Sequence, residues 1–319
     1  MEKKNAINAQ MMKNFRFYDE HVAPMIREQF PDHESRIAVG IAGEGSDCFG
    51  FDDELSRDHD FGTGVCLWLT DEDMAQIGED LAKAYDALVG QKERAFYTER
   101  LKERRGVMTI HDFYSDILQT DCDTNNCNMT EDMWRMLDHS CLATAVNGEV
   151  FRDDLGQFSR FRKLLLDYYP DRVWRIRIAE KMHEYSAALQ VNYQRCMTRG
   201  DVVAAQVCRI NGMMAAMELF FLLSRKYMPY YKWSYRMLTQ TDTGGAFSAR
   251  IDELARLEPS GSAWEGTRYH ANRPNLKDRI VSLAEDIGYD LSEMLKEKGF
   301  IERINPYLES DVRHVLGQD

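Results

Sequence analysis

Two short motifs in the 319-residue chain carry residue types that suit phosphate and metal chemistry. Gly45 and Ser46 form a Gly-Ser pair, and Asp58 and Asp60 form an Asp-x-Asp triplet later in the segment Gly43–Gly62. Glycine lets backbone amides approach phosphate oxygens, and a serine hydroxyl adds a donor. Carboxylate oxygens are preferred ligands of magnesium. We therefore expect Gly45 and Ser46 to bind a nucleotide phosphate, and Asp58 and Asp60 to bind one or two Mg²⁺ ions.

Strand-like sequence flanks both motifs. Residues 36–42 read RIAVGIA, a β-branched and apolar run that predicts a buried strand leading into the Gly-Ser turn. In residues 58–69 apolar side chains alternate with a second set that includes Asp58 and Asp60. A strand here would point both carboxylates the same way, as a shared metal ion requires.

The remaining pattern divides the chain into a mixed part and a helical part. Apolar spacing predicts a helix over 5–29, Thr70 caps a predicted helix over 71–89, and Gly106–Phe113 predicts a third strand. Beyond Asp153 only helical patterns follow. The predicted fold is α+β, with a small mixed-sheet domain in residues 1–153 and an all-α domain in residues 154–319.

Asp112 is the only acid between Val107 and Phe113 in the predicted third strand. Asp47, Asp52 and Asp53, beside the motifs, are expected to cap turns or face solvent.

Two side chains of the helical part are candidates for a supporting role. Glu218 lies in an otherwise apolar helix, so it either pairs with a cation such as Arg209 or Arg225 or acts as a base for a substrate hydroxyl. Lys232 lies in the aromatic and basic run KYMPYYKWSYR. It either contacts the nucleotide phosphates or extends into solvent from a helix end.

The composition limits the classes of partner and compartment. With 53 acids against 40 Lys and Arg, the net charge of −13 repels a nucleic-acid backbone and favours a cationic small molecule. Seven scattered cysteines without a C-x-x-C pair indicate a reduced, cytoplasmic setting. The apolar run 202–223 contains Gln206, Arg209 and Asn211, so it predicts a buried helix rather than a membrane span.

The motifs resemble those of the nucleotidyltransferase superfamily that includes DNA polymerase beta, the aminoglycoside and lincosamide nucleotidyltransferases, and the CCA-adding enzymes. The shared pattern is an apolar strand, a Gly-Ser or Gly-Gly turn, and a spaced Asp-x-Asp or Asp-x-Glu. GEGSDCFGFDDELSRDHDFG is most similar to an uncharacterised bacterial branch known as a domain of unknown function. The resemblance is specific over residues 36–69 and loose elsewhere. It implies a mixed-sheet catalytic domain and a helical domain that completes the substrate cleft. It also implies a third carboxylate on a neighbouring strand, for which Asp112 is the candidate and Thr109 the alternative occupant of that place.

The predicted activity is therefore Mg-dependent transfer of a nucleoside monophosphate from a nucleoside triphosphate, with ATP as the first expectation, to a small hydroxyl- or amine-bearing acceptor. If the third carboxylate is lacking, the alternative is a non-catalytic nucleotide-binding or regulatory protein on the same fold. Another alternative is an enzyme that modifies a protein or a tRNA end. The acid balance makes tRNA the less favoured of these acceptors.

Overall fold

The computed structural model describes residues 9–53, 62–89 and 105–317. The chain divides into two compact units, Met1–Tyr168 and Tyr169–Asp319. The first unit contains a sheet with helices on both faces, whereas every regular element described in the second unit is helical. The structure is therefore α+β, with a small mixed sheet and many helices.

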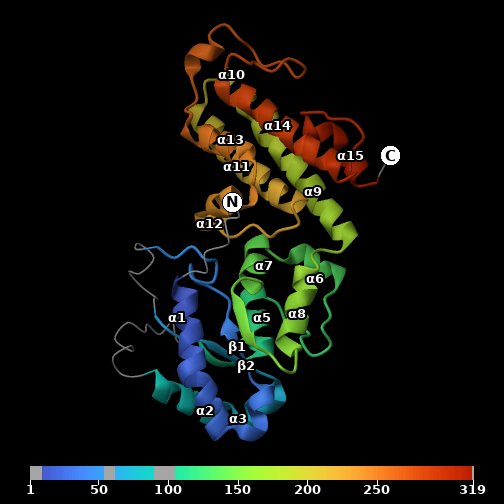
Figure 1. The fold of residues 1–319 in the computed structure, drawn as a ribbon. Coiled ribbons are helices and arrows are strands. Elements are labelled where there is room, and N and C mark those ends of the chain that lie inside the picture. The colour runs from blue at the N-terminus through green and yellow to red at the C-terminus, as the bar shows by residue number, and fades with distance from the viewer. Residues whose placement is uncertain (1–8, 54–61, 90–104, 318–319) are drawn as a thin grey trace. The chain divides into compact units, whose positions relative to one another are not determined.

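A four-stranded mixed sheet forms the centre of the first unit (Figure 1). Its strands run in the order β3 (Gly106–Thr109), β2 (Cys66–Leu69), β1 (Ala38–Ile41) and β4 (Glu149–Arg152). β1 is antiparallel to β2 and β4, and β2 is parallel to β3. Consequently β1 ends at the edge of the sheet where the other three strands begin. We call this edge the turn edge.

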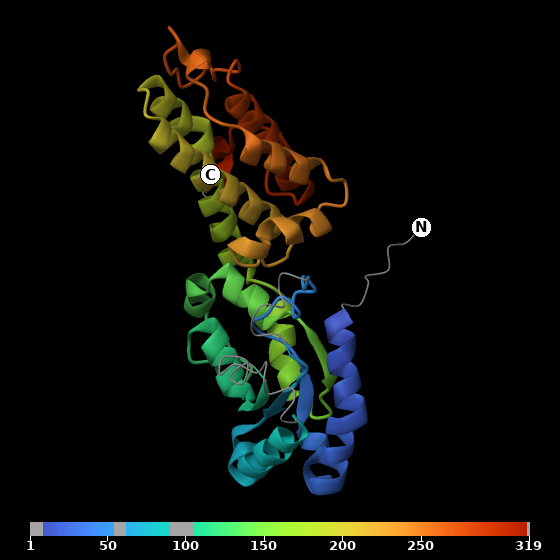
Figure 2. The ribbon, with the colours of Figure 1, turned by 90° about the vertical axis from the view of Figure 1, so that its left-hand side faces the viewer.

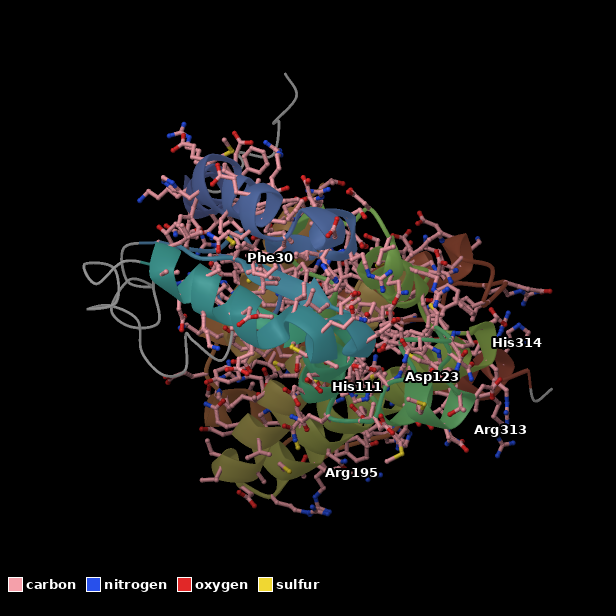
Figure 3. The ribbon with its side chains drawn as sticks, turned by 90° about the horizontal axis from the view of Figure 1, so that it is seen from below. Phe30, His111, Asp123, Arg195, Arg313 and His314 are labelled. Carbon is pink, nitrogen blue, oxygen red and sulfur yellow. The ribbon has the colours of Figure 1, made fainter. Side chains whose placement is uncertain are left out.

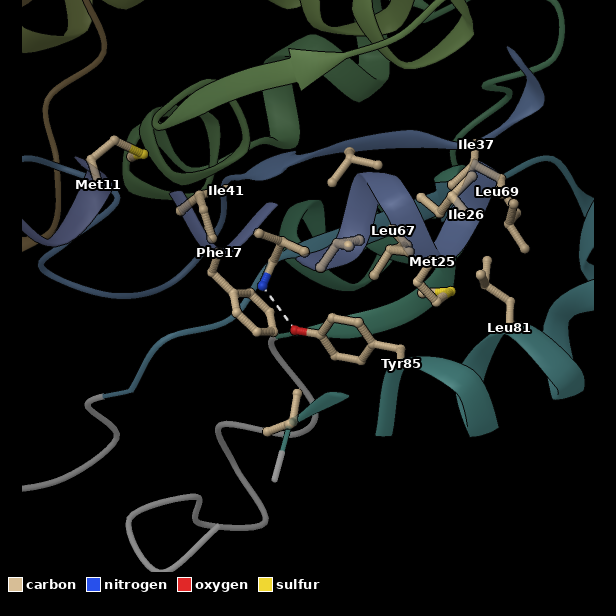
Figure 4. Packing of buried hydrophobic residues seen from close by; sticks show 14 of the residues in the cluster. Met11, Phe17, Met25, Ile26, Ile37, Ile41, Leu67, Leu69, Leu81 and Tyr85 are labelled. Carbon is tan, nitrogen blue, oxygen red and sulfur yellow. Dashed lines mark hydrogen bonds between the residues drawn. The ribbon is translucent and has the colours of Figure 1, made fainter. Parts of the chain in front are cut away.

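Helices cover both faces of this sheet (Figures 1 and 2). One face packs against a helical layer through the apolar cluster shown in Figure 4, to which Leu67 and Leu69 of β2 belong. At the edge of this cluster the Tyr85 hydroxyl accepts a hydrogen bond from the Val65 amide at 2.9 Å. This layer consists of α1 (Ala9–Phe17), a π-helical turn (Tyr18–Val22), α2 (Ala23–Gln29) and α3 (Asp71–Leu88). The opposite face carries α5 (Ile110–Leu118), α6 (Glu131–Met136), α7 (His139–Ala145) and α8 (Gln157–Leu166).

The alternation of β2 explains why both faces are covered. Leu67 and Leu69 point into the cluster with α1 to α3, and Trp68 points the other way. The Trp68 ring stacks on Phe158 of α8, with centroids 3.8 Å apart. This contact places α8 in the first unit, whereas the boundary drawn from the sequence after residue 153 placed it in the second.

Threonine caps determine where two of these helices begin. Thr70 Oγ1 accepts a hydrogen bond from the Asp73 amide at 3.1 Å, which confirms the predicted start of α3. Thr109 Oγ1 accepts one from the Asp112 amide at 2.8 Å, so β3 ends at Thr109 and α5 begins at Ile110. The prediction of a strand as far as Phe113 was therefore wrong, because the chain turns into a helix three residues after Gly106.

The second unit is a bundle of helices around α11 (Val202–Leu223). α11 is the one helix of the described chain that is long and apolar enough to cross a membrane, a test of length and composition that buried core helices also pass. Its second half is buried among other helices, and its first half exposes Val203. The other elements are α9 (Asp171–Tyr185), a π-helix (Ser186–Asn192), α10 (Tyr193–Thr198), α12 (Tyr231–Thr241), α13 (Ala246–Arg256), α14 (Arg279–Glu297) and α15 (Val312–Val315), with 3-10 turns at Gly261–Trp264 and Leu308–Asp311.

Candidate functional site

The predicted Gly-Ser turn lies at the turn edge, directly after β1. Gly43 and Gly45 have φ angles of 101° and 129°, which residues other than glycine rarely adopt. The Ser46 carbonyl accepts a hydrogen bond from the Phe51 amide at 2.8 Å and closes the turn. Within the described residues, the amides of Gly45 and Ser46 and the Ser46 hydroxyl make no hydrogen bond. Adjacent donors are therefore presented together.

A buried ion pair holds this turn against the sheet. Arg105, which immediately precedes β3, has a side chain only 3% exposed, and its Nη2 lies 3.0 Å from Asp47 Oδ2. The same nitrogen donates to Cys48 Sγ at 3.5 Å. Burial alone would lower the pKa of Arg105, but its neighbours Cys48 and Asp47 keep that pKa well above the ordinary value. The turn is thus fastened to the start of β3.

A second brace comes from the turn before β4. The Gly43 amide donates to Asn147 Oδ1 at 2.8 Å, and Asn147 Nδ2 donates to the Gly43 carbonyl at 2.7 Å. The Gly148 amide donates to the Cys48 carbonyl at 2.9 Å. Arg162 of α8 in turn donates to the Asn147 carbonyl at 2.7 Å. Three other segments of the first unit therefore fix the conformation of the Gly-Ser turn, with α8 acting through Asn147.

The two buried cysteines at the turn edge are neutral thiols. Burial raises the pKa of Cys48 and of Cys66, an effect that the nearby Arg105 only partly opposes. Both sulfurs remain protonated near neutral pH when no metal is bound. The carboxylate oxygens at this edge are the ligand type that magnesium prefers.

The turn edge is acidic. Residues 43–53 contain no Lys or Arg, and Glu149 at the start of β4 is exposed and pairs in register with Ile41. Asp58 and Asp60 lie outside the described residues. Among the residues that are described, no group of three or more His, Cys, Asp or Glu side chains is arranged to hold a metal ion. The acids in residues 43–53 are Glu44, Asp47, Asp52 and Asp53.

Asp112 is not brought together with the Gly-Ser turn. It occupies the first turn of α5, beyond the end of β3, and three residues of strand separate Thr109 from the turn edge by about 10 Å. Its side chain is 62% exposed and its Oδ1 lies 3.3 Å from His111 Nδ1. His111 Nε2 also lies 2.9 Å from Asp121 Oδ1, on the surface marked by the His111 and Asp123 labels in Figure 3.

Glu218 and Lys232 belong to the second unit. Glu218 is 8% exposed in α11, and its carboxylate lies 3.1 Å from Lys181 Nζ of α9. The structure thus has an ion pair, which was one of the two sequence interpretations, and Lys181 is a partner in it. Lys232 is exposed on α12, with its ammonium 5.2 Å from the Trp233 ring centroid.

Sequence reasoning missed the residues that brace the turn. Arg105 lay between a charged segment and a predicted strand, and Arg162 lay in a predicted helix, so neither carried a local signal. Asn147 was recognised only as part of an Asn-Gly turn. Its position two residues after α7 and just before the short strand β4 matters only once β4 pairs with β1.

Comparison with known proteins yields one partial match. The profile of a family described as a domain of unknown function (DUF4037) matches residues 134–234. This stretch begins in α6 of the first unit, ends in α12 of the second, and leaves the Gly-Ser turn outside the match. No curated protein and no solved structure matches the chain.

Proposed function

We propose that the turn edge of the first unit binds the triphosphate of a Mg-nucleoside triphosphate, ATP in the first instance. We further propose that the chain transfers the nucleoside monophosphate group to a small hydroxyl- or amine-bearing acceptor. The observation that carries this proposal is the Gly-Ser turn itself. It follows a buried strand, and in the described structure the amides of Gly45 and Ser46 and the Ser46 hydroxyl have no intramolecular acceptor.

The braces around the turn favour ligand binding. Consecutive amides in a turn that contains a positive-φ glycine form an anion-binding concavity. The Arg105–Asp47 ion pair and the Asn147–Gly43 hydrogen bonds hold this concavity in place before a ligand arrives. Binding then costs less conformational entropy than it would for a mobile loop.

The charge of the turn edge favours a nucleotide that arrives with a divalent cation. The carboxylates of residues 43–53 and of Glu149 would repel a bare triphosphate, and the buried Arg105 is already paired with Asp47. Magnesium, when bound, neutralises phosphate oxygens and prefers oxygen ligands. Asp58 and Asp60 are proposed to hold it, on the strength of the sequence motif. The same acidic edge would attract a cationic acceptor.

The residues of this chain then have distinct roles. The Ser46 hydroxyl and the Gly45 and Ser46 amides donate to phosphate oxygens. The acceptor oxygen or nitrogen forms a bond to the α-phosphorus while the bond to the leaving pyrophosphate breaks, and the acceptor's proton passes to a base. We assign this base to Glu149, which is exposed at the turn edge, in preference to Glu218, which is ion-paired with Lys181.

The reduced, cytoplasmic setting is part of the proposal. All seven cysteines are free thiols, and those at the turn edge are buried. An oxidising compartment is not required to hold this fold together.

One observation favours a second candidate function, nucleotide binding without turnover. At the turn edge, the described residue that leads into β3 is Arg105, whereas the resemblance implies a carboxylate on that neighbouring strand. With Asp112 beyond the opposite end of β3, the described strand supplies no third acid there. Such a protein would bind Mg-nucleotide and release no pyrophosphate.

Titration calorimetry and a pyrophosphate-release assay test both candidates. We expect the intact chain to bind MgATP or MgGTP, and Asp58→Asn and Asp60→Asn to weaken binding and abolish turnover. Asp52→Asn is the matched control, because it makes the same charge change nearby in the sequence but outside the predicted ligand set. Absence of binding for both nucleotides would overturn the proposal. Binding without pyrophosphate release for any acceptor would favour the second candidate.

A further inference from the structure

The second unit carries a cluster of exposed cations that we call the basic surface. Its members lie on or directly after α10 and in the loop that follows α13. Residues 193–200 and 266–277 contain no acid. All five are exposed, and none forms an ion pair with any described residue. They are Arg195, Arg199, Arg268, Arg273 and Lys277.

Hydrogen bonds fasten the loop along α10, so that the cations of the two segments adjoin. The Tyr269 amide donates to Thr198 Oγ1 at 3.0 Å, and the Asn275 amide donates to Gln194 Oε1 at 3.0 Å. The first of these bonds joins the immediate neighbours of Arg199 and Arg268. Figure 1 shows this loop running beside α10. The basic surface is therefore formed by two segments about seventy residues apart in the chain. Because each segment alone contains only a few cations, no local sequence pattern predicts the surface.

A buried aspartate anchors the far end of the loop. Asp278 is 3% exposed, and its Oδ2 accepts hydrogen bonds from Tyr193 at 2.9 Å and from Trp264 Nε1 at 2.7 Å. The same side chain caps α14 by accepting from the Ile280 amide at 2.9 Å. The loop thus holds its cations on a fixed framework rather than on an unattached segment.

The basic surface stands out against the rest of the chain. Acids exceed Lys and Arg by 53 to 40, and several half-buried or buried arginines elsewhere, among them Arg36, Arg105 and Arg152, are paired with carboxylates. Five adjoining cations without such partners create a local positive potential that the net charge of −13 conceals. The net charge led us to expect that the chain does not bind nucleic acid. The local charge of the basic surface is opposite in sign to that net charge.

The composition of the surface indicates phosphate as its ligand. Four of the five cations are arginines, whose planar guanidinium groups bind phosphate through two parallel hydrogen bonds. Aromatic rings lie among them. The Arg195 guanidinium lies 5.0 Å from the Tyr269 ring centroid, and Arg195 is at the margin of the view in Figure 3. Tyr307 is 41% exposed, and burial and the nearby Glu309 raise the pKa of its phenol. Tyr269 is also close enough to raise this pKa, and Arg195 is close enough to lower it.

We propose that the basic surface binds a single-stranded nucleic acid, with the arginines on its phosphates and the exposed Tyr307 ring against a base. Unstacked bases that stack on aromatic side chains beside backbone-binding cations are the usual arrangement for single strands. The surface belongs to the second unit alone. Its binding does not depend on nucleotidyl transfer at the turn edge, so either proposal can fail without the other.

Fluorescence anisotropy with the intact chain and labelled RNA or DNA single strands of about 20 nucleotides tests the proposal. We expect binding at about 50 mM salt that weakens steeply towards about 200 mM. Arg199→Gln with Arg273→Gln should weaken binding about tenfold and reduce the salt slope by about 1.4, because each phosphate contact to a single strand contributes about 0.7. The matched control is Lys298→Gln with Arg313→Gln, which removes two exposed cations outside the basic surface.

Circular dichroism and thermal melting establish that both double variants are folded. Arg268→Gln with Lys277→Gln is a second test pair, should the first pair not fold. Absence of binding to either single strand at low salt, or an equal loss for the test and control pairs, would overturn the proposal. Equal or tighter binding of a labelled polyglutamate peptide would also overturn it, because the partner would then be an acidic protein segment.

Discussion

The ion pair between Arg105 and Asp47 gives the sharpest prediction about the turn edge. Arg105→Met keeps an unbranched side chain of similar length and removes the charge. Asp47 then loses its buried partner, and Cys48 Sγ loses a hydrogen-bond donor. We expect the first unit to be destabilised and the Gly-Ser turn to lose its fixed conformation.

The magnitude follows from the burial of the two partners. Removing one member of a fully buried ion pair costs about 3–5 kcal/mol, because the remaining charge is left uncompensated. The Asp47 side chain is 16% exposed and the Arg105 side chain 3%, so solvent relieves part of the cost on the side of Asp47. We therefore expect a loss of about 2–3 kcal/mol for Arg105→Met. Adding Asp47→Asn should restore at least about 1 kcal/mol of this loss, because no buried charge then remains.

Native-state hydrogen exchange is the suitable assay, since two compact units need not unfold in one step. The amide of Gly106, which donates to the Val65 carbonyl at 2.9 Å, reports on the sheet beside the ion pair. Lys83→Met is the control, because its ion pair with Glu79 is on the surface and should contribute less than about 0.5 kcal/mol. The reasoning is refuted if Arg105→Met changes the exchange free energy by no more than this control.

Three further changes test other parts of the structure. Gly45→Ala should destabilise the turn by about 1–3 kcal/mol and weaken MgATP binding, because the φ of Gly45 is 129° and a Cβ atom would overlap the Asp47 carboxylate. Gly50→Ala, at φ 72° and with open space around it, should preserve binding. Equal losses of affinity for the two variants in calorimetry would contradict this. Glu218→Gln removes the charge that pairs with Lys181, so it should lower the stability of the second unit by about 1–2 kcal/mol and leave turnover unchanged. A loss of turnover in the folded variant would show that Glu218 has a catalytic role. Hydrogen bonds that His111 donates to Asp121 and then to Asp112 raise the pKa of His111. The contact therefore stabilises the fold below pH ~6.5, and this contribution is lost as the pH rises through the raised value. Asp121→Asn should lower the pKa of His111 in an NMR titration, and an unchanged titration would refute the assignment.

Local signals in the sequence were sufficient for the elements around the Gly-Ser turn. The apolar run RIAVGIA contains β1, and Thr70 with its acidic first turn marked the start of α3 to the residue. In both cases the determining interactions are short-range: β-branched side chains favour a strand, and a threonine hydroxyl satisfies an amide three residues away. Such interactions leave a pattern in a window of a few residues.

Long-range interactions explain what the sequence did not reveal. Arg105 and Asp47 are 58 residues apart, and Asn147 and Gly43 are 104 residues apart, so neither brace produces a local pattern. β4 is only four residues long and partly buried, and it is a strand because β1 offers it an edge. Thr109 is as suitable in a strand as at a helix cap. The helix begins after it because α5 buries apolar side chains against the sheet.

The amide signals of Gly45 and Ser46 provide the most direct test of the central claim that the Gly-Ser turn binds nucleotide phosphate. NMR spectra of the intact chain, labelled with ¹⁵N-glycine and ¹⁵N-serine, would be recorded while MgATP is added. We expect saturable shifts of the Gly45 and Ser46 amides, larger than the shift of Gly50 in the same loop, and the same shifts with pyrophosphate and magnesium. The claim is contradicted if these two amides do not move while MgATP binds elsewhere, or if no signal of the chain responds to MgATP or MgGTP.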